Sequence, residues 1–222
     1  MLVQLPVPPP AALAATGNAA LASGCLAVAA GTHGLADRFS VEVVPTGMTD
    51  AWGEAALADH IAGARPAVVG FSLYVWNTER SLHLARQIRR RSPGTLIVVG
   101  GPEVEPDNAF LLRQDGIDVA VRGEAEEVFP EILRRLSADE EIEGTPGTAV
   151  RTSGSLGEFV SSAPAAFPLR RYPSPYLAGI LPVKPERSAY VEMARGCASR
   201  CEFCYYSRGD AMVRRLDVKS AA

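Results

Sequence analysis

The sequence has few basic residues near its start and few cysteines, histidines and aromatic residues overall. No Lys or Arg precedes Arg38, so the basic region that opens a secretory signal peptide is absent. The Ala-rich stretch 11–30 is interrupted by polar and glycine positions and contains no apolar run long enough to cross a membrane. The net charge of −3 gives no broad cationic field for nucleic acid. We therefore expect a cytoplasmic protein that binds neither membrane nor nucleic acid.

Cysteine is scarce but unevenly placed. Three of the 4 cysteines, Cys197, Cys201 and Cys204, lie within one short stretch, whereas Cys25 stands far upstream. Such crowding with a fourth residue left over favours a metal or cluster site in a reducing compartment rather than a disulfide framework. Cys25 has small apolar neighbours and is interpreted as a buried core residue.

Apolar runs alternate with helical stripes through residues 1–137. The expected strands are residues 2–5, 40–44, 67–73, 95–99 and 117–121, and the expected helices are residues 18–31, 54–63, 78–91, 107–114 and 124–136. This alternation predicts an α/β domain with a doubly wound, five-stranded parallel sheet.

The rest of the chain is expected to form two further parts. Residues 138–187 are interpreted as a linker that contains a hairpin between 147–151 and 157–160, turning at Ser153-Gly154. Residues 188–222 begin a second unit, with a strand at 189–194 placed directly before the cysteine stretch. An isolated strand there would expose both of its edges to pairing.

The C-x3-C-x2-C spacing brings three thiolates into one loop, which can hold three irons of a [4Fe–4S] cluster and leave the fourth iron open. A zinc site usually takes a fourth Cys or His nearby, and none follows Cys204. A ferredoxin-type cluster takes four protein ligands, and only Cys25 remains for that role. A chance grouping of structural cysteines is the third alternative.

The stretch Cys197-Ala198-Ser199-Arg200-Cys201-Glu202-Phe203-Cys204, with an aromatic residue before its last cysteine and a strand before its first, resembles the signature of radical S-adenosylmethionine (SAM) enzymes. The resemblance implies that the open iron binds SAM. An electron from an external donor then cleaves the sulfonium to methionine and a 5′-deoxyadenosyl radical. Residues 190–206 resemble the subgroup that carries an N-terminal cobalamin-binding domain.

Open α/β sheets bind ligands at the carboxyl ends of their strands, near the point where the strand order reverses. Ser72 and Leu73 end one expected strand, and Gly100 and Gly101 directly follow the next. Together with residues 122–126 they resemble the cobalamin-binding domains attached to radical SAM enzymes. The resemblance implies that these four residues line the pocket of the corrinoid's nucleotide tail. No Asp-x-His-x-x-Gly motif occurs, so no histidine is implied beneath the cobalt.

A complete barrel of the radical SAM kind needs roughly 200–250 residues, and residues 188–222 are far fewer. The expected explanations are a fragment of a longer enzyme, a partner chain that completes the barrel, or a corrinoid-binding protein without catalysis. The leading hypothesis is a cobalamin-binding radical SAM protein that acts on an unidentified small molecule, with methyl transfer as a candidate reaction. The alternative is a non-catalytic corrinoid- or nucleotide-binding module with a vestigial cysteine motif.

Overall fold

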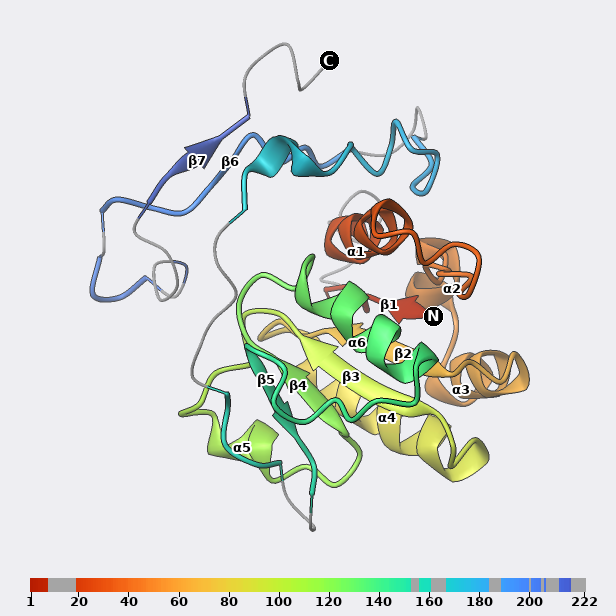
Figure 1. The fold of residues 1–222 in the computed structure, drawn as a ribbon. Helices are drawn as coiled ribbons and strands as arrows, with labels where there is room; N and C mark the ends of the chain where they lie inside the picture. Colours follow the sequence, from red (N-terminus) through yellow and green to blue (C-terminus); the bar gives the residue numbers. More distant parts are fainter. Residues whose placement is uncertain are drawn as a thin grey trace.

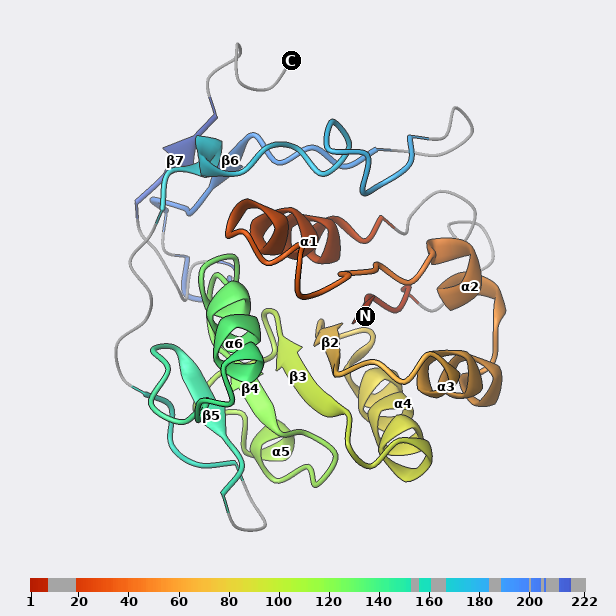
Figure 2. The ribbon, with the colours of Figure 1, turned by 45° about the vertical axis from the view of Figure 1, so that its right-hand side comes forward.

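The computed structural model describes residues 1–7, 19–152, 156–160, 167–183, 189–199, 201–204, 206 and 212–216. A central sheet carries helices on both of its faces, and a C-terminal segment crosses one end of this layered body (Figure 1). In a second view β2 (Val68–Ser72) and β3 (Leu96–Gly100) point toward that segment, so their carboxyl ends face it (Figure 2).

The main sheet has the order β1-β2-β3-β4-β5, in which the first four strands are parallel and the last is antiparallel to its neighbour. The strands are β1 (Leu2–Val3), β2 (Val68–Ser72), β3 (Leu96–Gly100), β4 (Val119–Val121), β5 (Thr148–Val150), β6 (Ala194–Arg195) and β7 (Arg214–Arg215). The helices are α1 (Leu21–Thr32), α2 (Thr46–Ala51), α3 (Glu54–Gly63), α4 (Thr78–Arg91), α5 (Ala109–Leu112), α6 (Val128–Ser137) and the 3-10 helix η1 (Leu169–Arg171).

The predicted α/β class and five-stranded sheet are confirmed, but one strand was assigned to the wrong segment. Residues 40–44 contribute only a single parallel bridge, from Val43 to Leu2, because β1 offers an edge of just 2 residues. The fifth strand is β5 instead, and it is antiparallel. Because Val43 lies on one side of β1 and β2 on the other, the strand order reverses between β1 and β2, which makes this the switch point of the sheet.

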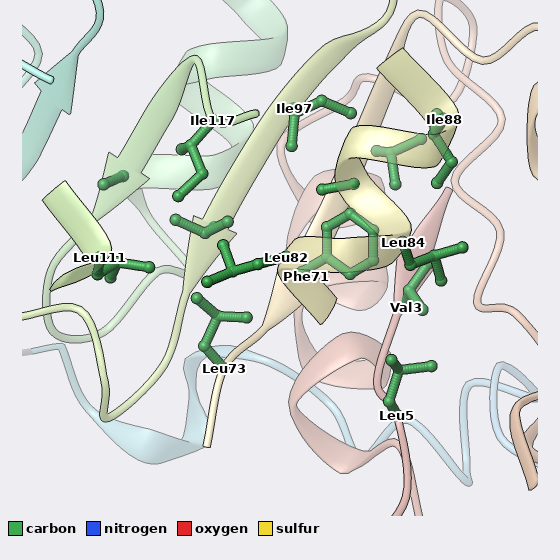
Figure 3. Close-up of a cluster of buried hydrophobic side chains, with 14 of the residues drawn as sticks. Val3, Leu5, Phe71, Leu73, Leu82, Leu84, Ile88, Ile97, Leu111 and Ile117 are labelled. Carbon is green, nitrogen blue, oxygen red and sulfur yellow. The ribbon is translucent and has the colours of Figure 1, made fainter. Parts of the chain in front are cut away.

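Two buried clusters fill the space between the layers. Successive side chains of a strand point to opposite faces of the sheet. On one face Phe71 and Ile97 pack against Leu84 and Ile88 of α4 (Figure 3). On the other face the sheet packs against α1 and α6. Both faces of the parallel strands are therefore covered, which explains their continuous apolar sequences.

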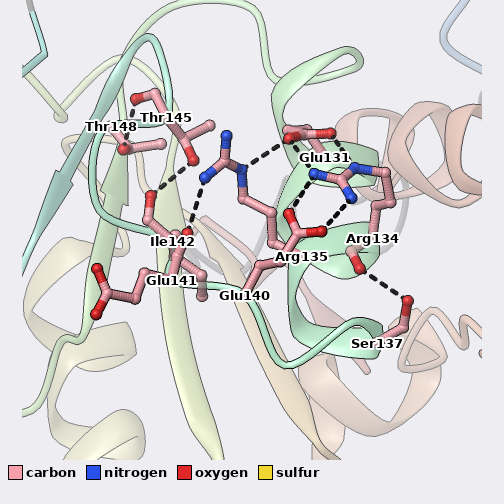
Figure 4. Close-up of polar contacts among 9 residues, drawn as sticks. All are labelled: Glu131, Arg134, Arg135, Ser137, Glu140, Glu141, Ile142, Thr145 and Thr148. Carbon is pink, nitrogen blue, oxygen red and sulfur yellow. Dashed lines mark hydrogen bonds and ion pairs between the residues drawn. The ribbon is translucent and has the colours of Figure 1, made fainter.

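A polar network connects α6 to β5 within the segment that the sequence predicts to be a linker (Figure 4). Arg134 and Arg135 both bind Glu131, and Arg135 also donates to the carbonyl of Glu141. The strand β5 then continues into the predicted hairpin, where the amide of Gly157 donates to the Val150 carbonyl at 2.9 Å. The predicted turn at 153–154 lies outside the described residues. Part of the expected linker thus belongs to the sheet.

The predicted strand at 189–194 is shorter and later than expected. Only Ala194 and Arg195 form β6, and one edge of β6 is paired with β7, so the expectation of two open edges is wrong. The sequence around β7 has no periodicity long enough to predict a 2-residue strand. Among the described residues no helix is long and apolar enough to cross a membrane.

Candidate cofactor-binding site

A cavity of about 350 Å³ lies at the carboxyl ends of β2 and β3, between the sheet and α1. Its floor comes from the two strands, one wall comes from Leu21 and Cys25 of α1, and a further wall comes from the loop that follows β4. This is the end of the sheet, beside the switch point, at which open α/β folds bind their ligands. None of the three histidines, all of which are described, lines the cavity.

The floor is made of unusually small residues. Ser72 is paired in register with Gly100, and Gly70 with Val98, so all four residues belong to the face of the sheet that α1 covers. A Cβ atom added at Gly100 would meet its nearest protein atom, the carbonyl oxygen of Val121, at 3.7 Å, which is ordinary contact. The protein itself therefore does not require glycine at position 100, whereas a ligand that approaches the backbone closely would.

Gly101 has a different, structural reason to be glycine. Its φ of 106° lies in the region that side chains rarely adopt. A Cβ there would lie 2.5 Å from the carbonyl oxygen of Leu73. The same two loops are joined by the amide of Leu73, which donates to the Gly100 carbonyl at 2.7 Å.

The structure corrects the expectation for Leu73. Its side chain is fully buried in the cluster beneath α4, on the face of the sheet opposite the cavity, and it is not among the lining residues. Strand alternation explains this, because Ser72 points toward α1 and its neighbour must point away. Ser72, Gly100 and Gly101 all line the cavity.

Asn77 holds the two strands together at the switch point. Its side chain is 1% exposed, accepts a hydrogen bond from the Tyr74 amide at 2.8 Å, and donates to the carbonyls of Leu5 and Ser72 at 3.0 and 3.1 Å. Leu5 follows β1 and Ser72 ends β2, so one amide group links both strand ends beside the cavity. The sequence reasoning did not single out Asn77, although an Asn that begins a helix just after a buried strand was the available signal.

The side of the cavity that α1 forms is apolar, whereas Glu124, Glu126, Glu192 and Arg195 line its opposite side. Burial first, and the carboxylates of Glu126 and Glu192 second, raise the pKa of the Cys25 thiol to about 12. Burial also raises the pKa of the Tyr74 hydroxyl. The ring of Tyr74 stacks on that of Trp76 with the centroids 4.7 Å apart. Cys25 was predicted to be a core residue, and the structure instead places it in the cavity wall.

Five charged residues join the cavity to the C-terminal segment, and we call them the arginine clamp: Arg195, Arg214, Glu124, Glu126 and Glu192. Arg195 reaches Glu192 at 2.6 Å, Glu126 at 2.8 Å and Glu124 at 3.2 Å. Arg214 forms an ion pair with Glu124. The ring of Phe167 lies near both guanidinium groups, at 5.6 and 5.9 Å from its centroid. The sequence reasoning missed this set, because pairs 69 and 90 residues apart leave no local pattern.

The cysteine loop lies between β6 and β7, so it begins and ends at the clamp. None of the four cysteines, all of which are described, forms a disulfide, and of the three in the loop, Cys197, Cys201 and Cys204, Cys201 is exposed. The amide of Cys204 donates to the carbonyl of Cys201 at 3.0 Å, which folds the loop into a turn. Within the described part of the chain, no three Cys, His, Asp or Glu side chains approach closely enough to hold a metal ion. The three cysteines lie on one loop, but the described residues do not bring their side chains close enough together to share a metal ion.

The comparison with protein families decides the assignment of the first part of the chain. The model of the B12 binding domain matches residues 14–133, which is more than half of the sequence. The chain belongs to the B12-binding domain family. This domain runs from just before α1 through most of α6, and it includes the strand ends and the loop after β4 that form the cavity.

Two characterised relatives match beyond the B12-binding domain. The chain is 38% identical over 164 residues to the 2-(S-pantetheinyl)-carbapenam-3-carboxylate methyltransferase of Streptantibioticus cattleyicolor, a match that covers 68% of this chain and 24% of the relative. It is 36% identical over 161 residues to the cobalamin-dependent radical SAM methyltransferase TokK of Streptomyces tokunonensis, covering 67% and 23%. The chain thus matches about a quarter of the length of these relatives.

Solved structures share the fold. The radical SAM methyltransferase TsrM from Kitasatospora setae superposes with a TM-score of 0.68 at 19% identity, over 99% of this chain and 43% of that one. The cobalamin-dependent SAM radical enzyme OxsB, solved with aqua-cobalamin and SAM bound, gives a TM-score of 0.71 at 18% identity, over 99% and 30%. Since both likenesses extend across nearly the whole of this chain, they include the C-terminal segment as well as the B12-binding domain.

Proposed function

We propose that the chain binds cobalamin in the cavity at the carboxyl ends of β2 and β3. It carries the cobalamin-binding part and the cluster loop of a radical SAM methyltransferase that acts on a small molecule. The observation that supports this most directly is the floor of the cavity within a B12-binding domain, where the small residues Ser72 and Gly100 leave open space beside the switch point.

The residues around the cavity fit the nucleotide tail of a corrinoid. Ser72 offers a hydroxyl, and Gly100 and Gly101 allow the tail to approach the backbone. The neutral wall at Cys25 suits the apolar base of that tail. No histidine lines the cavity, so the residues that would hold the tail are Ser72, Gly100, Gly101 and the wall at Cys25.

In the same proposal Cys197, Cys201 and Cys204 hold a [4Fe–4S] cluster whose open iron binds SAM. When bound, this pair of cofactors supplies one-electron cleavage of SAM, with the electron taken from an external donor. The chain's own contribution is the donor set, which is three cysteines on one loop with no disulfide among them. Walls that shield the radical would come from further polypeptide, either continuous with this chain or supplied by a partner chain.

One observation favours a second candidate, a corrinoid-binding module without cluster chemistry. No metal-ligand grouping occurs among the described residues, and Cys201 and Phe203 are exposed. In this alternative the B12-binding domain works alone and the cysteine loop is vestigial.

Two measurements separate the candidates. Retention of hydroxocobalamin by the purified chain tests the cavity, and loss of retention in Gly100→Val assigns it to this site. Anaerobic reconstitution with iron and sulfide, followed by electron paramagnetic resonance of the reduced protein with and without SAM, tests the loop. About four irons per chain and a SAM-dependent signal support the cluster. Cys197→Ala should abolish both, whereas Cys25→Ser, the matched control, should not. Corrinoid retention without iron would leave only the second candidate.

A further inference from the structure

The hairpin that carries the cysteine loop has little backbone support of its own. β6 and β7 pair through 2 residues on each strand, and an isolated two-stranded ribbon of that length is not stable in water. Something other than the ladder must therefore fix the position of the loop relative to the B12-binding domain.

Arg195 has the contacts to do so. Its side chain is 18% exposed, and its guanidinium binds both oxygens of Glu192 on the approach to β6, at 2.9 and 2.6 Å. The same guanidinium reaches across to Glu126 at 2.8 Å and Glu124 at 3.2 Å, in the loop that follows β4. Arginine suits this task because its planar fork can serve several carboxylates at once.

Arg195 lies directly before the cysteine loop. Gly196 follows it, with a φ of 93° that turns the backbone sharply, and Cys197 comes next. Arg195 also lines the cavity, and it lines a neighbouring cavity of about 360 Å³ beneath the 167–183 segment. One side chain is therefore both a wall of the cofactor cavity and the anchor of the first cysteine.

We propose that Arg195 is a positioning residue that fixes the cysteine loop beside the cavity and transmits occupancy of the cavity to that loop through Glu124 and Glu126. The loop after β4 contributes Gly123, Glu124 and Glu126 to the cavity wall, so a molecule that fills the cavity bears on the same carboxylates that hold Arg195. By linkage, whatever stabilises those carboxylates when the cavity is filled stabilises the loop as well. The coupling to a corrinoid rests on the proposed function, whereas the anchoring of the loop does not.

The anchoring is tested first, on the full chain without cofactors, by hydrogen–deuterium exchange. In Arg195→Met, peptides that cover residues 196–206 should exchange about tenfold faster or more, because the buried carboxylate of Glu126 loses its guanidinium partner, while β2 and β3 stay protected. Arg195→Lys, which keeps the charge but loses the fork, should be intermediate. Glu126→Gln approaches the same contact from the other side and should also loosen the loop.

Arg171→Met is the matched control. Arg171 lies in the same C-terminal segment and forms an ion pair with Glu127 at 3.0 Å, and among the described residues it has no ion pair with the arginine clamp. It should leave exchange of the cysteine loop unchanged. Unchanged loop exchange in both Arg195→Met and Glu126→Gln overturns the proposal. So does equal loosening of the loop and of the parallel strands, which would make Arg195 a general stabilising residue.

The coupling is tested second, with hydroxocobalamin as the probe. In the native chain the corrinoid should slow exchange in residues 196–206. Arg195→Met removes part of the cavity wall, so its exchange is measured at a hydroxocobalamin concentration that equilibrium dialysis shows to saturate the variant. Bound corrinoid should then no longer protect the loop. Native loop exchange that does not respond to bound corrinoid refutes the coupling. A native chain that retains no corrinoid refutes the proposed function instead, and the result of the first experiment still decides whether Arg195 anchors the loop.

Discussion

Substitutions at two adjacent glycines, Gly100 at the end of β3 and Gly101 directly after it, should separate effects on stability from effects on ligand binding. At Gly100 the nearest protein atom to an added Cβ is 3.7 Å away, and the backbone is ordinary strand, so the fold can accept a side chain. In Gly100→Val the two methyl groups project toward the cavity. Valine is also favoured over glycine in a strand. The free energy of unfolding should change by no more than about 0.5 kcal/mol.

Gly100→Val should instead weaken the binding of a ligand that fills the cavity. Forcing extra methyl groups into a packed contact costs about 1–3 kcal/mol. That corresponds to roughly 5- to 150-fold weaker binding of hydroxocobalamin. Equilibrium dialysis followed by corrinoid absorbance measures the dissociation constant, and circular dichroism on the same samples measures the melting temperature. A smaller substitution, Gly100→Ala, should fall between the native chain and Gly100→Val in affinity.

Gly101→Ala is the contrasting variant. A left-handed backbone costs an alanine about 1–2 kcal/mol, and the 2.5 Å approach to the Leu73 carbonyl oxygen adds to this cost. A total of about 3 kcal/mol lowers the melting temperature by roughly 6–12 °C for a chain of this size. Gly100→Val that binds corrinoid as tightly as the native chain, at unchanged stability, would refute the placement of the ligand against Gly100. Melting of Gly101→Ala at the native temperature would refute the steric argument.

Three further outcomes are expected. Asn77→Asp removes the N–H donors that bind the carbonyls of Leu5 and Ser72 and places a carboxylate oxygen against them. The free energy of unfolding, measured in urea, should therefore fall by about 3 kcal/mol. A loss under about 1 kcal/mol would contradict the role of Asn77. Iodoacetamide at pH 8 should label the three loop cysteines well before Cys25, whose pKa burial raises to about 12, and mass spectrometry of early time points showing Cys25 labelled first would contradict this. The hydrogen bond from Arg134 lowers the pKa of Glu131 from 4.5 to about 2, so this carboxylate contributes stability above pH 4.5 that is lost as the pH falls toward 2. After discounting for solvent, Glu131→Gln should cost about 1 kcal/mol at pH 7 and less at pH 3, and a pH-independent difference would argue against the ion pair.

Much of the fold follows from local patterns. The helix at residues 54–63 and the helix at 78–91 are predicted to the residue, because each has an apolar stripe and a clear stop signal. The buried strand β2 is likewise evident from its unbroken apolar run. The strand β5 could not be predicted as part of the sheet, since its pairing with β4 joins segments about thirty residues apart and depends on which edge the sheet leaves free.

The site, like the fold, is predictable from the sequence only in part. Ser72, Gly100 and Gly101 line the cavity at the carboxyl ends of the strands, where an open α/β sheet is expected to bind a ligand. Their assignment to a corrinoid tail comes from the resemblance to cobalamin-binding domains and stays a prediction. Leu73 is misplaced because a prediction at the level of a segment ignores the alternation of side chains along a strand.

The arginine clamp could not be predicted from the sequence. Glu124 and Glu126 lie just before a helix, where acidic residues are common because they interact favourably with the positive end of the helix dipole. Their sequence positions therefore do not show whether they stabilise the helix or form ion pairs with a distant residue. Arg195 likewise stands beside the cysteines without any local signal of a partner. Only the fold brings these charges within 2.8 and 3.2 Å of one another, 69 and 71 residues apart in sequence. Since the hairpin ladder is too short to orient the loop, the residues that determine where the first thiol lies are those with the least visible sequence signature.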